Sequence, residues 1–88
     1  MKSKKVYIDV LAAFDPDGRI VPVQFRWTDG RKYQIDTVID IRPAPSLKAG
    51  GQGDRYTVRL LGQERYMFLE HDPDLTSNRL RWFVEGNT

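Results

Sequence analysis

The stretch VPVQFRWTDGRKYQIDTVIDI, residues 21–41, decides the fold. Apolar residues occupy alternate positions on both sides of Thr28-Asp29-Gly30, which is typical of two strands that each bury one face. A two-residue turn at Asp29-Gly30 would place Phe25 opposite a glutamine and mix core with surface, because directly opposed residues share a face. A three-residue loop with a left-handed Gly30 restores the parity. The predicted pairs are Phe25 with Tyr33, Val23 with Ile35 and Val21 with Thr37.

Residues 6–14 precede this hairpin and are expected to form the first strand. The turn sequence Asp15-Pro16-Asp17-Gly18 follows, with residue types that favour a tight loop. If all four residues form the loop, Val10 lies opposite Val23. Pro22 cannot donate a hydrogen bond to a neighbouring strand, so a β-bulge or sheet corner is predicted there.

The second half of the chain repeats the same pattern after a connection rich in proline and glycine, residues 43–53. Apolar residues alternate over positions 56–60, Tyr66 and Phe68 are assigned to the same face, and a polar loop at 72–78 leads to the last strand with Leu80, Trp82 and Val84. A turn at Gly62-Gln63-Glu64 predicts three further strands whose aromatic residues share one face. The predicted pairs are Val58 with Phe68, Leu60 with Tyr66, Phe68 with Trp82 and Tyr66 with Val84.

The 88 residues are therefore expected to form a single all-β domain, an antiparallel meander of five to six strands in a closed or partly open barrel. Residues 1–5 are expected to be a loose basic tail. An open sheet that dimerises through an edge is the alternative. The predicted core consists of Val23, Phe25, Tyr33, Ile35, Val58, Phe68, Trp82 and Val84.

The composition argues against catalysis. The chain contains no cysteine, so it has neither disulfides nor thiolate nucleophiles, and this suits a cytoplasmic protein. The only histidine, His71, stands beside Asp72, but adjacent strand residues point to opposite faces. The Asp-Pro-Asp segments at 15–17 and 72–74 are interpreted as turns rather than calcium loops. We expect no enzyme activity, cofactor, metal or membrane span.

The residue pattern on one face of the C-terminal strands predicts a binding partner. In the expected register Arg59, Met67 and Phe83 form a row on the second face of the C-terminal strands. Leu61, Leu69 and Arg81 flank this row. Large apolar groups on both faces of a strand need a cover, from elsewhere in the chain or from a partner. A small interaction module that binds a protein or a second copy of itself is the leading hypothesis.

Binding of single-stranded nucleic acid is the alternative, because small barrels stack bases on aromatic side chains inside basic grooves. Arg26 and Lys32 are opposed across the first hairpin, and Arg65 and Arg79 add to the positive charge near Arg59 and Arg81. The formal net charge of only +2, from fourteen basic and twelve acidic residues, weakens this hypothesis.

The sequence also resembles small uncharacterised bacterial proteins of about this length. The likeness lies in residues 22–27, in 30–35 with Val38, in 55–58 and in 81–85, and it combines a Phe-x-Trp, glycine and tyrosine hairpin with a closing Arg-Trp. The resemblance implies a compact β domain of bacterial, cytoplasmic origin. It implies no activity and no site residue.

Overall fold

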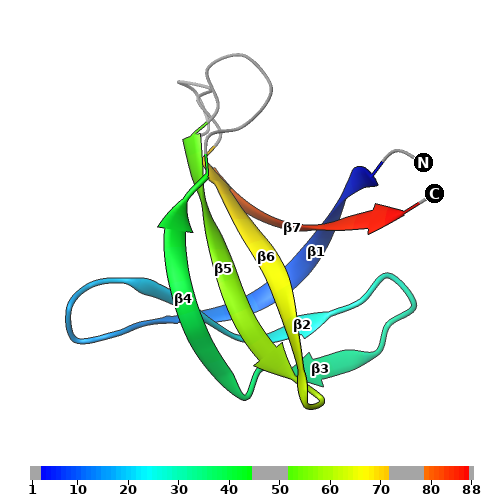
Figure 1. Cartoon of the computed structure of the whole chain (residues 1–88), viewed down its shortest axis with the longest axis horizontal. Coiled ribbons are helices and arrows are strands. Elements are labelled where there is room, and N and C mark those ends of the chain that lie inside the picture. Colours follow the sequence, from blue (N-terminus) through cyan, green and yellow to red (C-terminus); the bar gives the residue numbers. More distant parts are fainter. Residues whose placement is uncertain (1–2, 45–51, 72–78, 88) are drawn as a thin grey trace.

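The computed structural model describes residues 3–44, 52–71 and 79–87, which form one antiparallel sheet of seven strands (Figure 1). The sheet order is β3-β2-β1-β7-β6-β5-β4, and the described residues contain no helix. The strands are β1 (Ser3–Phe14), β2 (Ile20–Arg26), β3 (Lys32–Gln34), β4 (Thr37–Pro43), β5 (Gln52–Leu60), β6 (Gln63–His71) and β7 (Leu80–Asn87).

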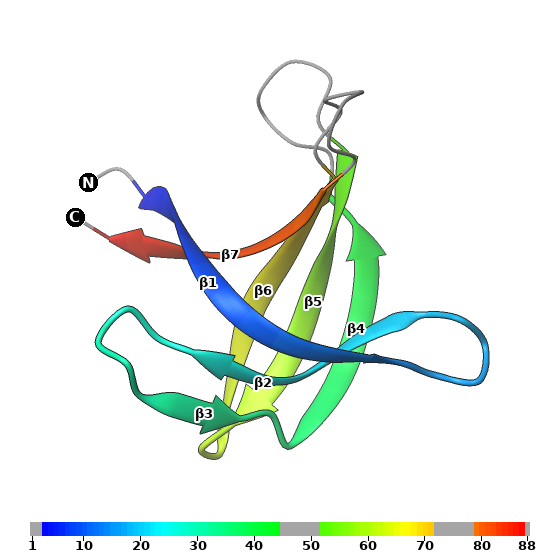
Figure 2. The ribbon, with the colours of Figure 1, turned by 180° about the vertical axis from the view of Figure 1, so that it is seen from behind.

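The sheet curls into a half-barrel, as the views from front and back show (Figures 1 and 2). Its edge strands β3 and β4 lie at opposite ends of the strand order, yet only Ile35 and Asp36 separate them in the chain. The amide of Ile35 donates to the Val23 carbonyl and that of Asp36 to the Arg59 carbonyl, both at 2.9 Å, so this link holds the two ends of the sheet together. The prediction of an all-β, partly open barrel is confirmed, with seven strands instead of five or six.

The first predicted register is confirmed where β2 meets β3. Phe25 lies opposite Tyr33, their rings stack with centroids 5.3 Å apart, and Gly30 closes the loop with a left-handed φ of 91°. The second arm does not continue as one strand. It leaves β2 after Gln34, and Thr37 pairs with Arg59 instead of Val21. The arm splits because it crosses from one edge of the curled sheet to the other.

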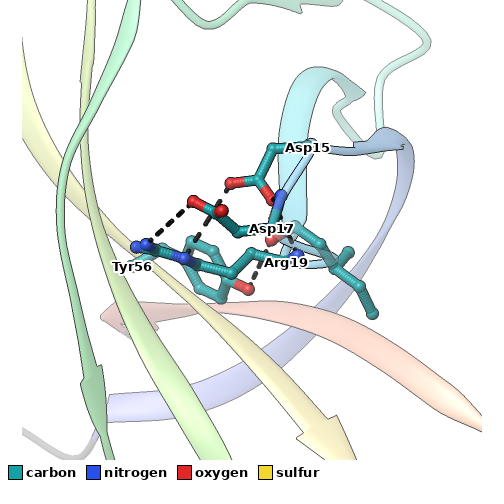
Figure 3. Close-up of polar contacts among 5 residues, drawn as sticks. Asp15, Asp17, Arg19 and Tyr56 are labelled. Atoms are coloured by element: carbon teal, nitrogen blue, oxygen red, sulfur yellow. Dashed lines mark hydrogen bonds and ion pairs between the residues drawn. The ribbon is translucent and has the colours of Figure 1, made fainter.

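The β1–β2 pairing differs from the prediction by two residues, since Phe25 lies opposite Val10. The turn is tighter than expected: Asp15 Oδ1 accepts hydrogen bonds from the amides of Asp17 and Arg19 (Figure 3). A bulge at Val23, beside Pro22, supplies the remaining offset and confirms the predicted irregularity.

A buried tyrosine fastens this hairpin to the other half of the sheet. The hydroxyl of Tyr56, on β5, donates a 2.6 Å hydrogen bond to the carbonyl of Ile20 at the start of β2 (Figure 3). Burial raises the pKa of Tyr56, and the carboxylates of Asp54 and Asp15 add to the rise, so the hydroxyl keeps its proton and remains a donor. The bond bridges the interior between strands that are not neighbours in the sheet.

The predicted β5–β6 register is wrong. Leu61 and Gly62 form a two-residue turn in which both φ angles are positive, 51° and 74°, and Val58 pairs with Arg65 rather than Phe68. A slip by an odd number of residues moves every side chain of the strand to the other face. Met67 and Leu69 therefore point into the core, whereas Tyr66 and Phe68 lie on the convex face.

The core fills the concave side of the half-barrel. It includes four of the predicted residues, with Tyr33 and Val84 packed against it. It includes neither Val23, which lies at the bulge of β2, nor Phe68, which pairs with Phe83 rather than Trp82. Residues 3–5 are not a loose tail, because β1 begins at Ser3 and pairs with the end of β7. The buried cluster consists of Phe25, Ile35, Tyr56, Val58, Leu60, Met67, Leu69 and Trp82.

Candidate functional site

The interaction surface expected from the sequence does not exist as one face. Met67 is only 1% exposed and Leu69 is buried beside it in the core, so neither is available to a partner. Arg59, Arg81 and Phe83 lie on the opposite, convex face. Phe83 is itself 9% exposed, because Phe68 stacks on it at 4.9 Å between ring centroids. The apolar residues of the expected surface are thus covered by the chain itself: Met67 and Leu69 lie in the core, and Phe68 covers Phe83.

The convex face carries a polar network centred on Glu70. Its carboxylate accepts hydrogen bonds from Lys5 Nζ at 2.6 Å, from the Tyr7 hydroxyl at 2.9 Å and from Arg81 at 3.2 Å. Lys5 also lies over the Phe83 ring, and the Arg81 guanidinium lies over the Tyr7 ring. Burial alone would raise the pKa of Glu70. The hydrogen bonds from Lys5 and Tyr7 and the positive charges of Lys5 and Arg81 outweigh burial and lower this pKa. The network joins β1, β6 and β7 and has a structural role.

Glu70→Gln is expected to lower the free energy of unfolding by about 1–2 kcal/mol at pH 7, because it removes the charge that three donors stabilise. A depressed carboxyl pKa contributes stability above the ordinary pKa of about 4.3, and this is lost as pH falls through the folded-state value. Urea unfolding should therefore show the difference between variant and wild type closing below about pH 4. A difference that stays constant from pH 7 to pH 3 would contradict this role.

The alternative basic surface is also dispersed. Arg26 and Lys32 are directly opposed on β2 and β3, as expected, and Asp9 lies opposite Arg26 on its other side. Arg65 lies opposite Val58 on the concave face, and Arg79 precedes β7. These four basic residues therefore do not lie together in one groove.

A different feature stands out, a break in the sheet between β6 and β7. The two strands pair only from His71 with Leu80 to Phe68 with Phe83. Beyond that point β7 follows β1 while β6 follows β5, and the two strands diverge (Figures 1 and 2). We call this wedge, between residues 63–67 of β6 and 84–87 of β7, the seam.

The seam opens into a cavity of about 690 Å³. Phe25, Trp27 and Tyr33 form its apolar floor, with Met67 and Val84 at the sides. Its charged lining residues are Glu64, Arg65 and Glu85. Among these, Arg65 donates to the Gln63 side chain and Glu64 lies 3.9 Å from Arg59. The buried and half-buried residues of the lining are thus apolar, and its charged residues are exposed, a combination that ligand sites commonly show.

Backbone groups that pair with no described strand line the seam. Leu60 and Gln63 close the two-residue turn, so they exchange both hydrogen bonds, and along an antiparallel ladder the direction of these bonds alternates. The N–H and C=O groups of Arg65 and Met67 therefore point to β5, while those of Glu64 and Tyr66 point into the seam. The same alternation on β7 directs the groups of Glu85 into the seam from the other side. No described strand pairs with these groups.

Sequence reasoning placed Phe25 and Tyr33 in the core and gave Trp27 no role outside the first hairpin. Phe25, Tyr33 and Trp27 line the seam because β6 and β7 stop pairing after Phe68 and Phe83. The point at which two strands stop pairing leaves no pattern in the side chains. A large aromatic residue directly before the loop of the first hairpin, Trp27, was the one available signal in the sequence.

The described residues contain no cluster of three or more potential metal-ligating side chains and no helix with the length and apolar character needed to cross a bilayer. His71 is exposed at the end of β6, and the segment 72–74 lies outside the described residues, as does most of the 43–53 connection. Comparisons with protein-family models, curated proteins and solved structures found no match.

Proposed function

We propose that this protein is a non-catalytic interaction module that binds an extended segment of a protein partner as an added strand in the seam. The unpaired backbone groups of Glu64 and Tyr66, beside an apolar cavity, carry the proposal. Added strands obtain affinity from main-chain hydrogen bonds and specificity from pockets that take alternate side chains. Here the aromatic floor offers such a pocket. The absence of cysteine further supports a cytoplasmic setting.

The seam suits a peptide strand better than a second sheet or a nucleic acid. It exposes only a short edge, because β6 is already paired with β7 from Phe68 onward. Its lining carries two carboxylates, Glu64 and Glu85, against one guanidinium, Arg65, so the balance of charge disfavours phosphates. The aromatic floor still resembles a base-stacking platform, so single-stranded DNA belongs in the test as a competing ligand.

The proposal is tested by selecting binders from a random linear-peptide library and comparing two variants. Tyr66→Pro removes the N–H that points into the seam but no hydrogen bond to β5, so the fold is expected to persist. Binding should weaken by about 10- to 100-fold, because the peptide carbonyl loses its donor. Tyr66→Ala keeps that N–H and should weaken binding by a much smaller factor.

Fluorescence anisotropy with labelled peptides measures both affinities, and light scattering reports the oligomeric state. Selected peptides that bind the Tyr66→Pro variant as tightly as the wild type would refute strand addition in the seam. A dimer that dissociates in this variant would identify a second copy as the occupant. Tight, salt-sensitive binding of single-stranded DNA would favour the nucleic-acid function instead.

A further inference from the structure

We propose that the segment bound in the seam alternates basic and apolar residues, with its basic side chains on the convex face. This inference rests on the proposed function and specifies its ligand. The side chains that border the seam on each face, and their existing partners, define this pattern.

The convex border of the seam is acidic and incompletely neutralised. None of the ion pairs among the described side chains includes Glu85. Lys5, which lies directly opposite Glu85 on β1, is instead bonded to Glu70 at 2.6 Å. Across the seam, Glu64 has only the exposed Arg59 at 3.9 Å. Two carboxylates thus flank the opening with little compensating charge.

An added strand would bring its own side chains into these two borders. Residues directly opposite Glu64 and Tyr66 share their convex face, because opposed residues of a ladder point the same way. A lysine or arginine opposite Glu64 pairs with that carboxylate. One opposite Tyr66 lies on the side of Glu85, because the β6–β7 register continued from Phe68 with Phe83 places Glu85 across from Tyr66, and it also lies beside the Tyr66 ring. That ring already holds one cation, since the Arg55 guanidinium lies 4.7 Å from its centroid.

The intervening residues of the added strand point the opposite way, into the cavity. There they meet Phe25, Trp27, Tyr33, Met67 and Val84, which accept apolar side chains. Arg65 is the charged lining residue on this face, so a further cation there is disfavoured as well. A ligand strand in which basic and apolar residues alternate therefore fits the seam: its basic residues lie on the convex face and its apolar residues point into the cavity. A strand with acidic outward residues would place like charges opposite Glu64 and Glu85, which is destabilising.

Two synthetic peptides, capped at both ends, test the inference: one alternates lysine with valine and the other glutamate with valine. The lysine peptide should bind wild-type protein about tenfold more tightly, given two favourable cross-strand pairs. The double variant Glu64→Lys/Glu85→Lys should invert the preference. Asp17→Lys, in an exposed turn outside the seam, alters net charge in the same direction and should preserve it.

The outcomes separate this inference from the proposed function. Equal binding of both peptides, or a preference that Asp17→Lys changes as much as the seam variant does, would overturn the basic–apolar inference while leaving strand addition intact. Failure of both peptides, together with library binders indifferent to Tyr66→Pro, would refute the proposed function itself. An inverted preference in the double variant alone supports both.

Discussion

Met67→Ala is expected to lower the free energy of unfolding by about 3 kcal/mol, because it leaves a cavity where a side chain only 1% exposed now packs. Phe68→Ala should cost less, about 1–2 kcal/mol, although phenylalanine is the larger residue. Phe68 is half-buried on the convex face, where stacking on Phe83 is its main aromatic contact. Urea unfolding of the two variants measures both values.

The order of these two costs tests the β5–β6 register. With a two-residue turn at Leu61-Gly62, Met67 faces the core. With the three-residue turn that the sequence favoured, Phe68 would face the core and the order would reverse. The slope of unfolding free energy against urea should stay close to the wild-type value in both variants, so that the comparison reports folded-state packing.

Trp27→Ala is expected to weaken peptide binding by about 30-fold or more, or about 2 kcal/mol, because tryptophan residues that a partner covers completely at the centre of a binding site often dominate its energetics. Trp27 lies on the floor of the cavity and packs against the buried cluster. The variant should also be somewhat less stable, so affinity must be measured at a temperature where it is fully folded.

Phe14→Ala provides the matched control. Phe14 is 76% exposed on the β1–β2 hairpin and does not line the cavity. Its removal deletes a comparable aromatic surface outside the seam, so affinity should stay within about twofold. Titration calorimetry with a library-selected peptide compares the two variants. A loss as large in Phe14→Ala as in Trp27→Ala would show that binding follows general apolar exposure and not the seam.

The first hairpin shows why part of the fold was predictable. Residues 21–35 alternate apolar and polar side chains, so only one register keeps Phe25 and Tyr33 on the same face, and Gly30 supplies the left-handed residue which that register needs. In β6, by contrast, Tyr66, Met67, Phe68 and Leu69 are all apolar or aromatic. Parity cannot then distinguish the two faces, and register is weakly specified.

The turn before β6 added to the ambiguity. Gly62 is compatible with both turns, but the actual turn also places Leu61 at a positive φ, which few non-glycine residues adopt. The seam was less predictable still. It arises because β7 pairs with β1 as far as Asn87 but with β6 only as far as Phe83, and ladder lengths between distant strands leave no local pattern.

Hydrogen exchange of the β6 amides tests strand addition most directly. In the free protein the amides of Glu64 and Tyr66 should exchange quickly and those of Arg65 and Met67 slowly, because only the second pair donates to β5. With saturating peptide, Glu64 and Tyr66 should become protected by about tenfold or more, whereas Arg65 and Met67 change little. If Glu64 and Tyr66 still exchange quickly in the complex, the peptide does not pair with β6 and the account is wrong.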